Sequence, residues 1–345
     1  MKDLKYIAAY SIPIIASISI FLRGYYSFLT PVYVFGIIPF IEFFTPASTE
    51  NLDDTTRLSK SKRKVFNWLL YINLPIIYSI LFFALFTITT TTLHLYEIIG
   101  IIISTGIVLG ANGINVAHEL GHRFTKERFI AKVLLLPSLY MHFYVEHNFG
   151  HHQKAATKDD PATAAFNQPL YFFWFTSVIG QYYSAWKIQK SILTQHKLSF
   201  LSIKNDMLWY QIITIFYLAI IFLCFNVTGL VFAVLCGIVG FLLLETINYI
   251  EHYGLVRKKT TSGRYERVRE IHSWNSNHLL GRILLFELTR HSDHHYRASK
   301  KYQILDHHDL SPQLPYGYPT SMVLSFFPPI WFKLMNKHIP DQMKT

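Results

Sequence analysis

The chain has 345 residues, of which 51% are hydrophobic and only 15% charged, against roughly 25% charged residues in soluble proteins, so an ordinary soluble globule is disfavoured. A net charge of +11 at pH 7 raises nucleic acid or an anionic membrane surface as a partner. The two cysteines, Cys224 and Cys236, lie in apolar runs, which excludes a disulfide framework, a zinc ribbon and a four-cysteine iron centre.

Six apolar stretches are long enough to cross a membrane, which takes about 20 residues of helix for roughly 30 Å of hydrocarbon. The first lacks the cleavage site of a signal peptide, so we predict a retained helix. Only a few residues separate the first stretch from the second and the fifth from the sixth, which predicts two antiparallel hairpins. The predicted spans are residues 6–22, 26–46, 67–90, 97–117, 207–225 and 228–250.

Basic residues mark one side of these spans. Every Lys and Arg except Arg23 lies in the N-terminal tail, in residues 47–66, in residues 118–206 or in residues 251–345. Because cytoplasmic loops carry the excess of positive charge, we predict both termini and the two long polar segments in the cytoplasm, on the inner membrane. The expected protein is one membrane-embedded catalytic domain over residues 1–345, all-α, with a histidine-rich cytoplasmic region. The net positive charge is then explained by the membrane topology, and nucleic acid is excluded as a partner.

The fourth span ends in HELGH at residues 118–122. On a helix, side chains four residues apart share a face, so His118 and His122 can bind one metal ion from a rigid element. Such a pair also arises by chance and occurs in zinc proteases, so this motif alone leaves metal binding open.

Two more histidine clusters lie on the predicted cytoplasmic side. One has the spacing HxxxHH, with His147, His151 and His152, and the other has HxxHH, with His291, His294 and His295. Each places three imidazoles on about one turn of helix, and the alternative to metal binding is a surface histidine run. A single histidine, His252, follows the sixth span. It can be a metal ligand only if it leaves the membrane beside these clusters.

Nine imidazoles are too many for one metal ion. Two ions with four or five ligands each would use them and leave positions open for a small molecule. Neutral imidazole suits iron, copper, zinc and nickel alike, so the residues leave the ion open. Four carboxylates adjoin the ligand positions and either orient the imidazoles or serve as ordinary solvated or capping charges. They are Glu119, Glu146, Glu251 and Asp293.

As a set, the clusters resemble the integral-membrane, histidine-rich diiron oxygenases and desaturases. NYIEHYGL at residues 248–255 resembles the signature that separates alkane 1-monooxygenases, and the related xylene monooxygenases, from desaturases. HELGH, EHNFGHH, TRHSDHH and HSWNSNH resemble the same branch, and the similarity covers about residues 100–310. Arg123 and Thr289 stand where Lys and Gln are more usual, but both only flank the ligands.

The resemblance implies two non-haem irons and no catalytic residue beyond their ligands. His272 is the main competitor for a ligand role, and we expect it near the site as support, with Trp274 and Asn275. The implied ligands are His118, His122, His147, His151, His152, His252, His291, His294 and His295.

The implied reaction is O2-dependent hydroxylation of the terminal methyl group of medium- and long-chain n-alkanes to 1-alkanols. A saturated chain offers no hydrogen bond or charge, so only an apolar tunnel can recognise it, and it dissolves in the lipid bilayer. Because the chain has no flavin or nucleotide motif and no cysteine cluster, electrons must come from outside. The resemblance implies rubredoxin as donor, with rubredoxin reductase and NAD(P)H upstream.

A basic cytoplasmic segment has two interpretations. It steers an acidic partner, or it enforces topology and contacts anionic lipid. The segment contains Arg257, Lys258, Lys259, Arg264, Arg267 and Arg269.

Other functions stay open. A fatty-acid desaturase or hydroxylase, or a xylene-monooxygenase-like methyl hydroxylase, would use the same metal site. A histidine-rich transporter or metal-binding protein would instead place metal ligands inside the bilayer. Here the clusters follow the spans, and acidic residues within the spans, such as Glu42 and Glu245, are few.

Overall fold

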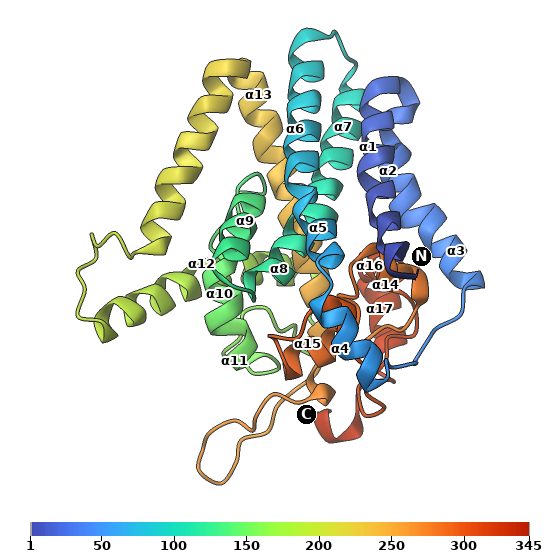
Figure 1. Cartoon of the computed structure of the whole chain (residues 1–345), viewed down its shortest axis with the longest axis vertical. Helices are drawn as coiled ribbons and strands as arrows, with labels where there is room; N and C mark the ends of the chain where they lie inside the picture. The colour runs from blue at the N-terminus through green and yellow to red at the C-terminus, as the bar shows by residue number, and fades with distance from the viewer. Residues whose placement is uncertain (1, 345) are drawn as a thin grey trace. The chain divides into compact units, whose positions relative to one another are not determined.

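The computed structural model describes residues 2–344, and among these it contains helices, loops and isolated β-bridges but no strand. Figure 1 shows the helices in chain order. The all-α, polytopic fold class is therefore confirmed. Within residues 2–344, five helices are long and apolar enough to cross a membrane: Asp3–Leu22, Gly24–Phe44, Val65–Thr90, Leu95–Gly121 and Asp206–His252.

The fifth of these helices, α13 (Asp206–His252), has 47 residues and covers both of the last two predicted spans. Its backbone leaves helical geometry at Asn226, where φ is 56° and ψ is −169°. Asparagine adopts positive φ more readily than most residues, so it suits a sharp reversal between two apolar segments. This break lies at the predicted turn between residues 225 and 228.

The chain divides into two compact units, of which unit 1 contains the residues up to Ile37, Lys64–Val145 and Ala185–Leu244. Short 3-10 and π segments interrupt its apolar helices. Its elements are η1 (Lys2–Tyr10), α1 (Ser11–Leu22), η2 (Gly24–Phe28), α2 (Leu29–Val32), η3 (Tyr33–Ile37), α5 (Val65–Tyr71), α6 (Asn73–Thr90), α7 (Leu95–Val108), η4 (Leu109–Ile114), α8 (Asn115–Gly121), α9 (Thr125–Leu135) and most of α13.

Small residues on α7 let neighbouring helices of unit 1 approach closely. A Cβ atom on Gly106 would lie 2.4 Å from Cβ of Val239 in α13, and one on Gly100 would lie 2.2 Å from Oγ of Ser27 in η2. Ser104 also donates a hydrogen bond to the carbonyl of Ser27, at 2.8 Å. Because lipid provides no hydrophobic force between helices, such close packing and polar contacts hold the bundle together.

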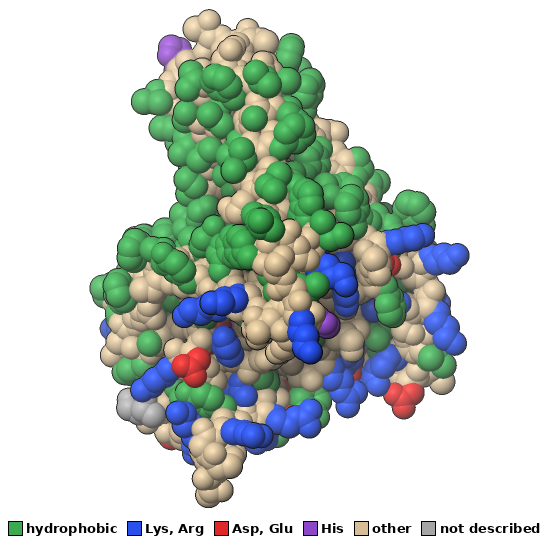
Figure 2. All heavy atoms as spheres, turned by 90° about the vertical axis from the view of Figure 1, so that its left-hand side faces the viewer, with side chains coloured by type: hydrophobic (Ala, Val, Ile, Leu, Met, Phe, Trp, Pro, Cys, Tyr) green, Lys and Arg blue, Asp and Glu red, His purple; other side chains and the backbone are tan. Residues whose placement is uncertain are grey.

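Large apolar side chains cover the outward-facing positions of unit 1. Phe82 on α6, and Ile215, Phe216 and Leu223 on α13, are each more than 60% exposed. Figure 2 shows hydrophobic side chains covering the helices on the face that carries α13. A contiguous apolar surface of this kind marks contact with a membrane rather than with water.

Unit 2 contains Ile38–Arg63, Glu146–Ser184 and the described residues from Glu245 onward. Two helices join the units along the chain, α10 (Phe143–Glu146) and α12 (Leu170–Gln195), and the last turns of α13 also belong to unit 2. Its other elements are α3 (Ile38–Phe44), α4 (Asp54–Lys62), η5 (His147–His151), α11 (His152–Lys154), η6 (Glu270–His272), α14 (Leu279–Leu284), α15 (His291–Tyr296), η7 (Tyr302–Ile304), α16 (Tyr318–Ser325), α17 (Pro328–Met335) and η8 (Asp341–Met343).

A buried arginine fixes the start of α15 within unit 2. Arg290 is 1% exposed, and its guanidinium donates hydrogen bonds to the carbonyls of Leu305 at 2.6 Å and of Glu50 at 2.8 Å. Three segments that are far apart in sequence are thus tied together by one side chain. The next residue is His291, so this network positions the third histidine cluster.

Candidate metal centre

Unit 2 brings together seven of the nine predicted ligands. They come from three places: the π-helix η5 with the start of α11, the last turn of α13, and α15. The seven form two groups of imidazoles whose nitrogens lie close enough to share a metal ion. They are His147, His151, His152, His252, His291, His294 and His295.

The first group consists of four buried histidines, His151, His252, His291 and His295. Each offers one ring nitrogen, and these nitrogens all lie within 4.8 Å of one another. Nε2 of His151 is 3.2 Å from Nε2 of His295, and Nε2 of His291 is 3.3 Å from Nε2 of His252. Four imidazole nitrogens therefore converge on one point inside unit 2.

Hydrogen bonds at Nδ1 set the tautomers of two of these rings. His151 Nδ1 lies 2.9 Å from a carboxylate oxygen of Asp160, and His252 Nδ1 lies 3.2 Å from the backbone carbonyl of His272. A carboxylate and a carbonyl only accept, so both Nδ1 atoms donate, and each Nε2 keeps its lone pair for the convergence point. This is the arrangement that orients histidines towards a metal ion.

Asp160 is a buried carboxylate that stays ionised because of its surroundings. Burial by itself would raise the pKa of Asp160, but the His151 ring and the hydroxyl of Thr163 hold that pKa below its usual range. Thr163 Oγ1 donates to Asp160 at 2.6 Å, and the backbone N–H of Ala162 donates at 3.1 Å. The carboxylate is thereby locked facing His151 and supplies negative charge beside the imidazoles.

The second group in unit 2 contains His147, His152 and His294, which also offer nitrogens within 4.8 Å of one another. His147 and His152 are five residues apart, and their Nε2 atoms lie 3.0 Å apart. In a π-helix such as η5, hydrogen bonds join residues i and i+5, which brings these two rings together. The trio that we expected on one turn is therefore divided, with His151 in the first group.

The remaining two predicted ligands lie in unit 1, at the end of α8. The rings of His118 and His122 have their centroids 5.4 Å apart and are almost perpendicular. Their proximity agrees with the predicted shared face of a helix. Next to them, Arg123 forms an ion pair with Glu119 at 2.6 Å and donates to Asn67 at 2.8 Å, which holds the end of α8.

The donor set of unit 2 fits a transition metal ion. Imidazole nitrogens are ligands for iron, copper, zinc and nickel, and all four rings of the first group are buried from water. The lone pairs of His151 and His252 already point inward, so little reorganisation accompanies metal binding. A metal would also remove the repulsion between facing nitrogen lone pairs.

Of the predicted supporting carboxylates, Glu251 lies against a proposed ligand. Its Oε2 is 3.1 Å from Nε2 of His291, and its Oε1 accepts a hydrogen bond from the hydroxyl of Tyr318 at 2.8 Å. Glu146 instead accepts from Ser184 Oγ at 3.2 Å. The four carboxylates thus have different surroundings, and Glu251 is the one that contacts a ring of the first histidine group.

Asp293 anchors α15 rather than a ligand ring. Its carboxylate accepts from His308 Nε2 at 2.8 Å, from Lys300 Nζ at 2.6 Å and from the backbone N–H of Asp306 at 2.8 Å. These contacts tie α15, which carries three proposed ligands, to the chain that follows it.

His272, Trp274 and Asn275 support the site through backbone contacts. The carbonyl of His272 orients His252, whereas its own Nδ1 accepts from the backbone N–H of Arg269 at 2.9 Å. The indole of Trp274 donates to the carbonyl of Tyr253 at 2.9 Å, and Asn275 Oδ1 accepts the N–H of Ser292 at 2.9 Å. His272 lies outside both groups of converging nitrogens, which agrees with a supporting role.

Two residues of this site, Asp160 and Tyr318, were not predicted. Asp160 follows another aspartate in a polar loop, and Tyr318 lies 67 residues after Glu251. No spacing or motif distinguishes either residue in the sequence, because both reach the histidines only through the tertiary fold.

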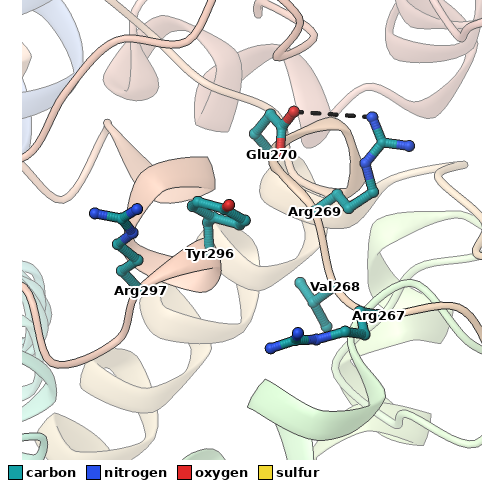
Figure 3. A pocket seen from close by; sticks show the side chains of 6 residues that line it. All are labelled: Arg267, Val268, Arg269, Glu270, Tyr296 and Arg297. Atoms are coloured by element: carbon teal, nitrogen blue, oxygen red, sulfur yellow. Dashed lines mark ion pairs between the residues drawn. The ribbon is translucent and has the colours of Figure 1, made fainter.

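A basic pocket of about 550 Å³ also lies in unit 2. Figure 3 shows its lining, in which Arg267 and Arg269 come from the segment before η6, and Tyr296 and Arg297 from the end of α15. Arg269 forms a long ion pair of 3.9 Å with Glu270, and the guanidinium of Arg297 lies 5.5 Å from the ring centroid of Tyr296. Tyr296 directly follows His295, so this pocket is one residue along the chain from the first histidine group.

The chain is similar to known proteins over most of its length. The family model for fatty acid desaturases matches residues 94–324. The curated alkane 1-monooxygenase 2 of Alcanivorax borkumensis is 36% identical over 92% of this chain and 84% of its own length. The alkane 1-monooxygenase of Ectopseudomonas oleovorans is 35% identical over 89% of this chain and 77% of its own length.

A more distant relative is the hydroxylase component of xylene/toluene monooxygenase from Pseudomonas putida. It is 26% identical over 77% of this chain and 72% of its own length. The two alkane 1-monooxygenases named above are thus more similar to this chain, and over more of its length, than this relative is.

Proposed function

The chain belongs to the alkane 1-monooxygenases, within the membrane fatty acid desaturase and hydroxylase superfamily, and we propose that it hydroxylates medium- and long-chain n-alkanes to 1-alkanols. It is a multi-pass membrane oxidoreductase. The observation that supports this function most is the convergence of four buried imidazoles, two of them oriented through Nδ1. O2 and the alkane are the proposed substrates.

The proposed cofactor is a pair of non-haem irons held by nine histidines. The two groups in unit 2 supply seven of them, and the resemblance of HELGH to the family's first motif supports adding His118 and His122. The second group needs additional ligands, since three imidazoles alone leave a transition metal coordinatively open. On this proposal both units belong to one catalytic domain.

The protein's own residues hold and orient the site. When bound, the irons would supply the activation of O2 needed to break a terminal C–H bond. Asp160 and the carbonyl of His272 fix the ring orientations of His151 and His252, while Glu251 contacts the ring of His291. The burial of the four rings of the first group limits competing water. The balanced reaction takes an alkane, O2, two electrons and two protons to a 1-alkanol and water.

We further propose that rubredoxin supplies the two electrons, with rubredoxin reductase and NAD(P)H upstream. Within the described residues both cysteines are free, and neither is part of a metal-binding group. The pocket of Arg267, Arg269 and Arg297 is a suitable contact for an acidic protein, because it is positively charged and lies one residue from His295. A donor at this pocket would have a short path to the first histidine group.

The proposed location is the inner membrane, with both termini in the cytoplasm. The distribution of Lys and Arg supports this orientation, since Arg23 alone lies on the opposite side of the predicted spans.

The test is product analysis with purified protein in lipid nanodiscs, supplied with rubredoxin, its reductase, NADH and n-alkanes from octane to hexadecane. The proposal predicts 1-alkanols and a metal content of two irons per chain. Double bonds in acyl lipids without 1-alkanols would establish a desaturase instead. A metal content dominated by zinc in protein that turns over would contradict the iron assignment.

A further inference from the structure

A second site in unit 2 lies at a cavity of about 500 Å³ beside α3, α14 and α16. One side of it is formed by Phe40 and Phe43 of α3, whose side chains are 68% and 79% exposed. Tyr316 and Thr320 also line it. The exposed rings of Phe40, Phe43 and Tyr316 form an aromatic rim, and the lining also includes a buried carboxyl group.

That carboxyl group belongs to Glu42, which is 3% exposed. Its Oε1 accepts the backbone N–H of Gly281 at 2.9 Å. Its Oε2 is buried and has no hydrogen-bond partner among the residues that the structure describes. An unsatisfied buried oxygen of this kind costs free energy, which a ligand that donates a hydrogen bond would recover.

Two glycines leave room for this carboxyl group. A Cβ atom on Gly317 would lie 2.0 Å from Oε2, and one on Gly281 would lie 2.7 Å from Oε1. Neither position could carry a side chain without moving Glu42. The space around the carboxyl group is thus built by residues from α14 and from the turn before α16.

The chemistry of the cavity defines its ligand. The aromatic rim suits an apolar chain, and Glu42 lies near the end of a helix apolar enough to cross a membrane, so the ligand reaches the cavity from lipid. The unpartnered oxygen requires a head group with an O–H or N–H donor. A bare alkane lacks such a group, whereas a 1-alkanol combines one hydroxyl with an apolar chain.

The cavity wall is also connected to the metal centre. Tyr318 follows Gly317, and its hydroxyl donates to Glu251, whose other oxygen lies 3.1 Å from Nε2 of His291. A ligand against Gly317 would therefore lie next to Tyr318, whose hydrogen-bond partner Glu251 contacts the first histidine group.

We propose that the Glu42 cavity binds the hydroxyl head of a 1-alkanol, the product of the proposed function on which this inference rests. The site retains the alcohol after hydroxylation and returns it to the lipid phase, with Glu42 Oε2 accepting the hydrogen bond. Membrane lipids with a donor head group, such as phosphatidylethanolamine, share this chemistry and are the other source of a ligand.

The experiment uses the complete protein in nanodiscs of phosphatidylcholine, whose head group has no N–H or O–H donor, at pH 8. The probes are a photoreactive 1-dodecanol and its methyl ether, which lacks only the donor. Labelled residues are identified by mass spectrometry. We expect labelling at the aromatic rim, with the alcohol preferred over the ether by about tenfold. Equal labelling by both probes would overturn the proposal.

A matched variant tests the role of the carboxyl group. In Glu42→Gln the amide oxygen keeps the bond from Gly281, and an N–H2 group replaces Oε2, so the preference should shift from the alcohol towards the ether. Glu50→Gln, which changes an exposed carboxyl group in the same unit, should keep the wild-type preference. Should Glu42→Gln fail to fold, Thr320→Phe places a larger side chain in the cavity lining and should abolish labelling by both probes.

The remaining measurements distinguish a 1-alkanol from a membrane lipid as the ligand, and failure of this site from failure of the proposed function. Displacement of the alcohol probe by phosphatidylethanolamine, but not by unlabelled 1-dodecanol, would overturn the product assignment. Unselective labelling of a protein that forms 1-alkanols would overturn this site and leave the proposed function standing. Selective labelling of a protein that forms no 1-alkanol would overturn the proposed function instead.

Discussion

His151 owes the direction of its Nε2 lone pair to a carboxylate nine residues away. Asp160 accepts from Nδ1, and it is held in place by Thr163 and the N–H of Ala162. Mutation of residues that orient metal-binding histidines typically lowers metal affinity or activity by about 10- to 100-fold. Asp160 is therefore expected to be important for the metal site, although no motif in the sequence indicates this.

We expect Asp160→Ala to lower iron affinity by about 10- to 100-fold, because His151 loses both its orientation and a neighbouring negative charge. Asp160→Asn should fall between Ala and wild type, since the amide oxygen still accepts from Nδ1. Iron titration of the purified apoprotein, with alkanol formation as a second readout, measures both. Wild-type affinity in Asp160→Ala would remove this residue from the metal centre.

Removing a ligand itself should have a larger effect. His151→Ala is expected to abolish alkane oxidation while the protein stays folded in the membrane, because one of four converging imidazoles is lost. His196→Ala, which removes an exposed histidine outside the two groups, is the control and should retain activity. Turnover by His151→Ala would exclude His151 as a ligand.

The π-helix η5 explains how one short segment serves two histidine groups. In an α-helix, His147 and His151 share a face, but the wider hydrogen-bond spacing brings His152 next to His147 and leaves His151 with the other group. HxxxHH predicts a metal-binding segment, yet it does not reveal the local helix type. That is decided by packing around η5.

Close helix packing in unit 1 depends on glycine, which has no side chain beyond hydrogen. We expect Gly106→Ala to destabilise the protein by about 1–3 kcal/mol, because its Cβ atom would overlap Val239 of α13. Gly36→Ala is the control, since a Cβ atom there meets no atom within 4 Å. The measurement is thermal unfolding in nanodiscs, followed by tryptophan fluorescence. A Gly106→Ala protein as stable as Gly36→Ala would show that α7 and α13 are not packed so closely.

Across the whole molecule, apolar helices and buried histidines depend on different forces. Lipid-facing positions such as Phe82 and Leu223 need only be apolar, whereas the histidine groups place many imidazoles in a small buried volume. Without a metal ion, that burial is unfavourable because the rings lose hydration and their lone pairs face one another. Metal binding and folding should therefore be coupled.

Iron removal tests this coupling. Dialysis against a chelator should abolish alkanol formation and lower the unfolding temperature, because the metal binds the folded state preferentially. Adding iron back should restore both, and zinc should restore stability without turnover. An apoprotein with unchanged stability would indicate that the histidine groups are held by protein contacts alone.

Orientation is testable on the intact protein. With Cys224 and Cys236 replaced by serine, a single cysteine at Ser262 should react with an impermeant maleimide only after the cells are opened. A single cysteine at Thr92, in the loop between α6 and α7, should react in intact cells, because that loop carries no Lys or Arg. The reverse pattern would invert the proposed topology.

Hydropathy and charge by themselves determined the apolar helices, their approximate bounds and the side predicted for the basic residues. The first four predicted spans agree with apolar helices of the structure, because hydrophobic length is a local property of the chain. The motifs also determined the family, since the clusters and NYIEHYGL combine in one branch. Asn226 then divides the last apolar segment where two spans were predicted to meet.

Only the tertiary structure decided which histidines of unit 2 share a group, which carboxylates face them and where a carboxyl oxygen is left unpartnered. Asp160, Tyr318 and Glu42 carry no motif, and each gains its role from residues brought near by folding. Spacing along a helix predicts that imidazoles can bind a metal ion. The packing of several segments decides the direction of each lone pair, because hydrogen bonds at Nδ1 come from other parts of the chain.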